Sequence, residues 1–70
     1  MKSVIILDDT ELFEKARIFV VDSNIDEAYW RVNDYMSIRE KNWSGNWMDL
    51  RESCEDGNFI AYENCEVINL

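Results

Sequence analysis

The chain has 70 residues, of which 15 are acidic and 7 basic, and it has no histidine, so its formal net charge is −8. A hydrophobic content of 47% is too high for a disordered chain. The length allows only one hydrophobic core. Direct binding to nucleic acid is disfavoured, because phosphate contacts require a surface rich in Lys and Arg. The composition therefore predicts one small acidic domain that spans residues 1–70.

The N-terminal apolar run, residues 4–7, ends at Asp8. It is too short for a signal peptide or for a membrane span. We therefore expect a cytoplasmic protein that does not contact membranes. Cys54 and Cys65 permit one disulfide, although reduced thiols are more usual in such a chain, and the sequence leaves the pairing open. Their spacing does not match a zinc site.

Two strands are predicted in the N-terminal third. Residues 4–7 form a continuous run of β-forming apolar residues, and residues 15–21 are rich in β-branched residues. Residues 8–13 between them predict an acidic turn, from which Leu12 and Phe13 fold back onto the core.

A long amphipathic helix is predicted over residues 24–41. Ser23 or Asn24 provides an N-cap, and the turn at residues 44–46 ends the helix. Apolar residues recur on one face with helical spacing. This stripe consists of Ile25, Ala28, Tyr29, Val32 and Met36.

The C-terminal third is less regular. Residues 47–53 fit either a strand or one helical turn, and the turn at residues 56–58 precedes a strand at 59–62. Residues 65–70 predict a last strand. The expected fold is α+β: one antiparallel sheet of four to five short strands, in a ββαβββ-like order, packed against a single long helix. The alternative order is ββα followed by a short helix and a hairpin. Such a sheet leaves its second face open unless a partner or a second copy covers it.

Catalysis is not expected. The chain has no histidine to serve as a general base and no glycine-rich phosphate loop. No cofactor is predicted. Asp8, Asp9 and Glu11 could chelate a divalent cation in a metal-dependent enzyme or accessory subunit, but the run lacks the EF-hand spacing, so we predict no metal site.

Two features indicate a protein partner. Rows of carboxylates can imitate phosphates and attract a basic protein, although acidic residues also serve solubility. Trp30 lies off the apolar stripe among acidic residues, and an exposed tryptophan is a frequent anchor of protein interfaces. The predicted contact residues are Asp8, Asp9, Glu11, Glu14, Asp26, Glu27, Trp30 and Asp34.

In length and charge the chain resembles small acidic inhibitors made by bacteriophages, including anti-CRISPR and DNA-mimic anti-restriction proteins, and also antitoxins and bacterial immunity proteins. This resemblance implies a non-catalytic inhibitor in the host cytoplasm. It would occlude the nucleic-acid-binding surface of a basic protein such as a CRISPR effector or another defence nuclease. The alternative is a homodimeric assembly module, or an interaction module of the antitoxin or immunity type.

Overall fold

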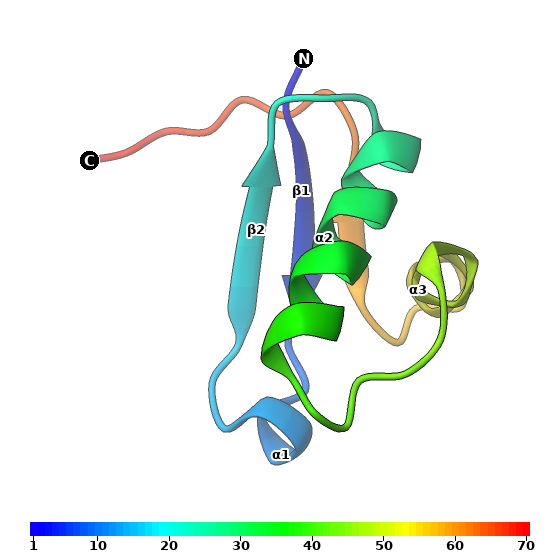
Figure 1. Ribbon diagram of the computed structural model, residues 1–70. Helices are drawn as coiled ribbons and strands as arrows, with labels where there is room; N and C mark the ends of the chain where they lie inside the picture. Colours follow the sequence, from blue (N-terminus) through cyan, green and yellow to red (C-terminus); the bar gives the residue numbers. More distant parts are fainter.

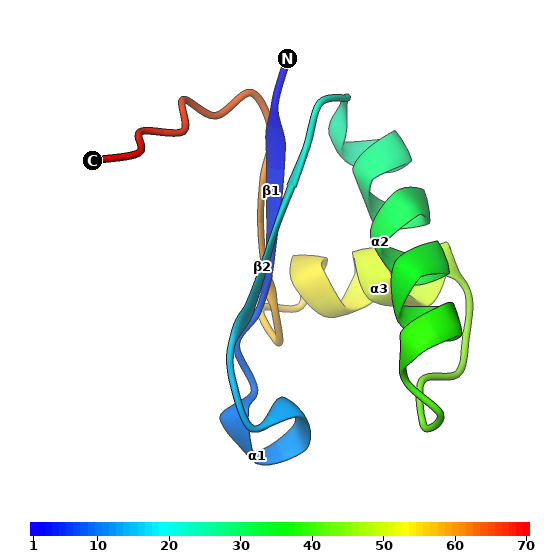
Figure 2. The same ribbon diagram turned by 60° about the vertical axis from the view of Figure 1, so that its left-hand side comes forward.

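The computed structural model describes residues 1–70, except the side chain of Leu12. Its elements follow the order β1 (Ser3–Leu7), α1 (Thr10–Phe13), β2 (Arg17–Val21), α2 (Ile25–Arg39), α3 (Trp47–Glu55) and β3 (Ile60–Tyr62), as Figure 1 shows. The α+β class is confirmed. The strands form one layer, and α2 and α3 cover the same face of that layer (Figures 1 and 2).

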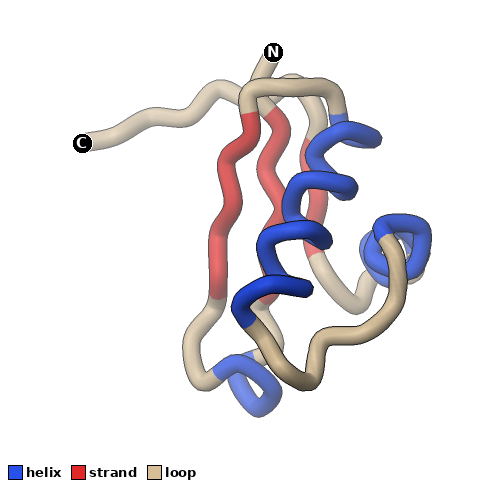
Figure 3. The backbone as a smooth tube through the Cα atoms, viewed as in Figure 1, coloured by secondary structure: helices blue, strands red, loops and turns tan.

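The sheet has three antiparallel strands in the order β2-β1-β3, so the prediction of four to five strands is wrong. Residues 65–70 do not form a strand. The backbone N–H of Cys65 donates to the carbonyl of Lys2 at 2.7 Å, and the chain then leaves the sheet (Figure 3). Strand propensity alone does not form a strand, because a strand also needs a neighbour to pair with, and residues 65–70 pair with neither β2 nor β3.

The long helix forms as predicted, although it ends at Arg39 rather than at residue 41. Asn24 is its N-cap, and its side chain accepts a hydrogen bond from the N–H of Glu27 at 2.9 Å. The C-cap Glu40 leaves the helical conformation. From there the chain turns back, and the indole N–H of Trp43 donates to the Asn33 side chain at 2.9 Å. The predicted stripe supplies the buried residues of α2, namely Ala28, Tyr29, Val32 and Met36.

A second helix replaces the ambiguous segment, so the prediction of a single long helix is wrong. Helix α3 begins with a capping box. The Asn46 side chain accepts from the N–H of Asp49 at 3.2 Å, and the Asp49 carboxylate accepts from the N–H of Asn46 at 2.9 Å. Leu50 is the buried residue of α3, and Trp47 and Cys54 also pack against the core. The short apolar stripe and the paired cap together favour a helix over a strand.

The expected acidic turn contains one helical turn, α1. The Asp9 side chain accepts from the N–H of Glu11 at 3.1 Å, which caps α1. Glu14 ends it with a left-handed φ of 65°. Phe13 packs against the core as predicted, whereas the prediction for the Leu12 side chain lies outside the described residues.

The core lies between the sheet and the two helices. Its buried hydrophobic residues are Ile5, Leu7, Val21, Ala28, Tyr29, Val32, Met36 and Leu50. Because strand side chains alternate between faces, one side of the sheet is closed by the helices and the other remains open.

Candidate protein-binding surface

The outward side of α2 carries four of the predicted contact residues. At 100° per residue, Trp30 lies about 145° around the helix from the centre of the buried stripe. Asp26, Glu27 and Asp34 lie within about 60° of Trp30 on the same count. We call these four residues the acidic helical face. The helix thus brings this half of the predicted site together.

Trp30 is exposed within this face. Its exposed fraction is 56%, as its position off the stripe predicts. Asp26 and Asp34 lie one helical turn before and after it, where side chains on a helix are neighbours. In the part of the chain that the structure describes, neither carboxylate has an ion-pair partner. A large apolar side chain therefore stands between two carboxylates that form no ion pair, although Asp26 lies close enough to Arg51 to help raise the pKa of its guanidinium.

Helix α3 extends the acidic surface with residues that the sequence interpretation did not select. It lies crosswise to α2 (Figures 1 and 2), and its exposed side includes Met48, 52% exposed, and Glu52. Arg51 forms an ion pair with Glu55 at 2.9 Å, and this hydrogen bond raises the pKa of the guanidinium. The Asn46-to-Asp49 capping pattern was the sequence signal that could have predicted α3 and its outward carboxylates.

The other predicted half, Asp8, Asp9, Glu11 and Glu14, lies apart from the acidic helical face. These residues surround α1, which lies near the C-terminal end of α2, where the Phe13 and Trp43 rings are 6.2 Å apart. Asp26 and Glu27 occupy the first turn of α2, at its other end. A helix of 15 residues is about 22 Å long. The four residues around α1 therefore form a second acidic patch, which lies about one helix length from Asp26 and Glu27 but nearer to Asp34, in the C-terminal half of α2.

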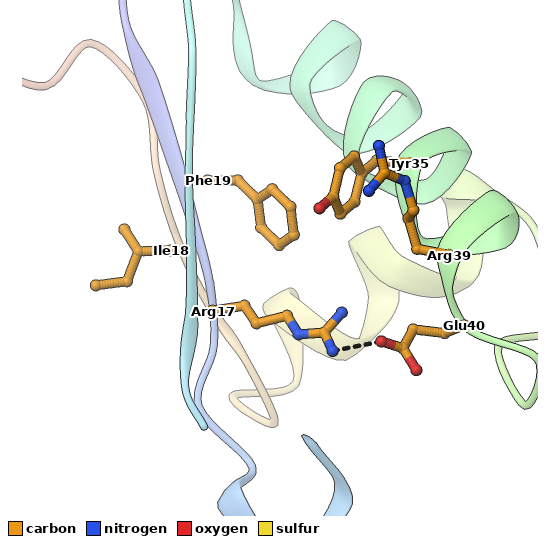
Figure 4. Close-up of a pocket in the computed structure, with 6 residues that line it drawn as sticks. All are labelled: Arg17, Ile18, Phe19, Tyr35, Arg39 and Glu40. Carbon is orange, nitrogen blue, oxygen red and sulfur yellow. Dashed lines mark ion pairs between the residues drawn. The ribbon is translucent and has the colours of Figure 1, made fainter. Parts of the chain in front are cut away.

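A groove between β2 and α2 has a volume of about 460 Å³. Figure 4 shows Arg17 and Phe19 of β2 pointing toward Tyr35, Arg39 and Glu40. Arg17 forms an ion pair with Glu40, and the Phe19 and Tyr35 rings meet edge to face at 5.3 Å. The polar and aromatic groups are thus engaged with one another, and they join β2 to α2.

The two cysteines are free thiols, and each is half-buried. Desolvation by burial raises the pKa of Cys54 to about 11, against the smaller, opposing effect of a hydrogen bond with Tyr29. Burial also raises the pKa of Tyr29. Cys54 is therefore almost fully protonated at neutral pH and is a weak nucleophile.

Two further findings concern the described part of the chain. No three acidic, cysteine or histidine side chains there are grouped so that they could hold a metal ion. No helix there is long and apolar enough to span a membrane.

Comparison with known proteins gives no relative: no family model, no curated protein and no solved structure matches the chain.

Proposed function

We propose that this protein is a non-catalytic inhibitor that binds a basic nucleic-acid-binding protein, such as a CRISPR effector or another defence nuclease, and occludes its nucleic-acid-binding surface. It would act in the cytoplasm, and that of a host cell if the chain comes from a bacteriophage. The observation that carries the proposal is Trp30, which is 56% exposed among the carboxylates of the acidic helical face.

The composition of this face suits a basic partner. Aromatic residues are enriched at the centres of protein interfaces, and tryptophan is among the commonest anchors. The neighbouring carboxylates attract a positively charged surface over long range and accelerate association. The proposal thus assigns affinity to Trp30 and steering to Asp26, Glu27 and Asp34.

The net charge favours the same class of partner. A charge of −8 on 70 residues repels nucleic acid and attracts the Lys-rich and Arg-rich channels that bind it. The second acidic patch, around Asp8 and Glu14, lies about the length of α2 away from the first turn of that helix. We assign the anchor to the acidic helical face, because it carries Trp30, and a secondary contact to the α1 end.

The test is a titration of the protein, at nanomolar concentrations, into DNA-cleavage reactions of purified CRISPR effectors and restriction nucleases. We expect one of them to be inhibited at a molar ratio near one. Trp30→Ala should then weaken inhibition by about 30-fold, which corresponds to about 2 kcal/mol. Asp34→Lys should mainly slow association, because it reverses the local charge.

The matched control is Tyr62→Ala. Tyr62 is an aromatic residue with a similar exposed fraction, 59%, but it belongs to the sheet. This variant should inhibit nearly as well as the parent. Failure to inhibit any nuclease, or an equal loss in both alanine variants, would contradict the proposal.

A further inference from the structure

A second row of side chains on α2 runs beside the acidic helical face. Arg31, Tyr35 and Arg39 follow one another at intervals of four residues, so they are neighbours along the helix surface. All three are exposed. We call these three residues the basic ridge. Because the chain has 15 acidic residues and only 7 basic ones, two arginines in one row reverse its charge locally.

The two arginines of the basic ridge have no carboxylate partner within the protein. Each of the other two arginines forms an ion pair with a glutamate, whereas in the described part of the chain neither Arg31 nor Arg39 forms one. Arg39 lies over the Tyr35 ring, 4.9 Å from its centre (Figure 4). This cation–π contact does not satisfy the N–H donors of the guanidinium. Both guanidiniums can therefore donate hydrogen bonds to an anionic group of another molecule.

A hollow of about 330 Å³ lies between the basic ridge and the neighbouring row of α2. The residues of that row that line it are Trp30, Asp34 and Ile38. Trp30 is 56% exposed and Ile38 is 74% exposed. The hollow thus offers apolar contacts from one row and hydrogen-bond donors from the other.

A partner that binds the acidic helical face must also cover Arg31. On the helix, Arg31 lies one turn after Glu27 and three residues before Asp34, within about 60° of both. A stable interface covers about 800 Å² on each protein, which is more than the four side chains of the acidic helical face provide. Covering a guanidinium without giving it a partner is costly. The partner must therefore bring an anionic group to Arg31.

We infer that the basic ridge binds carboxylates of the partner, so that the partner carries an acidic segment directly beside the basic surface that receives Trp30. This inference rests on the proposed function and specifies the partner's surface further: it is basic and acidic in adjacent strips. The planar fork of an arginine matches a carboxylate with two parallel hydrogen bonds. Phosphates of nucleic acid are the other anions of this kind, but the proposed function removes nucleic acid from this surface.

Charge reversal tests the inference, because steering by net charge and contact with a carboxylate predict opposite results. Arg31→Glu replaces one positive by one negative charge, so the net charge goes from −8 to −10. If the partner's surface is basic throughout, this variant should bind at least as tightly as the parent. If carboxylates face Arg31, it should bind about 30-fold more weakly, because like charges then oppose each other. Biolayer interferometry on the inhibited nuclease, without nucleic acid, measures the difference.

Lys2→Glu is the matched control, because it makes the same change of net charge. Lys2 is exposed, and its carbonyl accepts a hydrogen bond from the N–H of Cys65, so it belongs to the sheet rather than to α2. This variant should bind at least as tightly as the parent. Arg39→Glu is a second variant in case Arg31→Glu lacks a native circular dichroism spectrum, and it should also bind more weakly.

Equal binding of Arg31→Glu and Lys2→Glu would overturn the inference and leave the proposed function standing. A loss of affinity that appears only when nucleic acid is present would also overturn it, because the basic ridge would then contact phosphates. A parent that binds no nuclease would instead refute the proposed function, and the inference with it.

Discussion

Replacing Val32 with aspartate should unfold the protein at pH 7. Val32 is 2% exposed and lies in the stripe that packs α2 onto the sheet. Loss of its burial costs about 1.5–3 kcal/mol. The new carboxylate has no partner in the core, which adds several kcal/mol. A domain of this size is stable by roughly 4–10 kcal/mol. The two costs together therefore equal or exceed the stability of the fold.

The assay is a urea titration followed by far-ultraviolet circular dichroism. Ile38→Asp is the control, because it places the same carboxylate on an exposed position of the same helix and should change the stability by less than about 1 kcal/mol. If Val32→Asp kept a native spectrum and the midpoint of the parent, the assignment of the buried side of α2 would be refuted.

Two more predictions concern the turn before α3 and the buried thiol. Gly45 has a φ of +106°, and a Cβ there would lie 2.5 Å from the Asp49 carboxylate that caps α3. Gly45→Ala should therefore lower the free energy of unfolding by about 2 kcal/mol. Gly57→Ala is the control and should cost less, because a Cβ at Gly57 meets no atom within 4 Å. Equal losses of stability in thermal melts of the two variants would refute the clash. Burial raises the folded-state pKa of Cys54 from 9.0 to about 11. Below pH 9 the thiol is neutral in both the folded and the unfolded chain, and the protein keeps its full stability. Between pH 9 and 11 the unfolded chain loses this proton more readily than the folded one, so the stability falls as the pH rises. Urea midpoints should fall across this range, less steeply in Cys54→Ser than in Cys65→Ser, and identical slopes would contradict this assignment.

The long helix shows what local pattern can predict. The buried residues of α2 and the exposed position of Trp30 follow from a 100° rotation per residue, which depends on no other part of the chain. The strands at residues 4–7 and 15–21 were predicted for a similar reason. Strand β2 nevertheless begins at Arg17, because it pairs with the five residues of β1.

The errors arise where the outcome depends on the rest of the fold. Residues 65–70 have the composition of a strand, but composition does not show whether a segment will pair with a sheet edge. The capping box from Asn46 to Asp49 was visible in the sequence. It predicts a helix at α3 only if the segment also has an apolar face, and if another element, here α2, is available for that face to pack against. The predicted contacts are the acidic loop at residues 8–14 and the outer face of the helix, and how far apart these two lie depends on the packing of α1 near the end of α2, which no local pattern encodes.

Competition for the partner tests the central claim most directly. Fluorescence anisotropy of labelled nucleic acid bound to the inhibited nuclease should be measured at increasing concentrations of the protein. If the acidic helical face occludes the nucleic-acid-binding surface, the apparent dissociation constant of the nucleic acid should rise in proportion to the protein concentration, and Trp30→Ala should need about 30-fold more protein for the same effect. A ternary complex in which the nucleic acid binds with unchanged affinity would contradict the account.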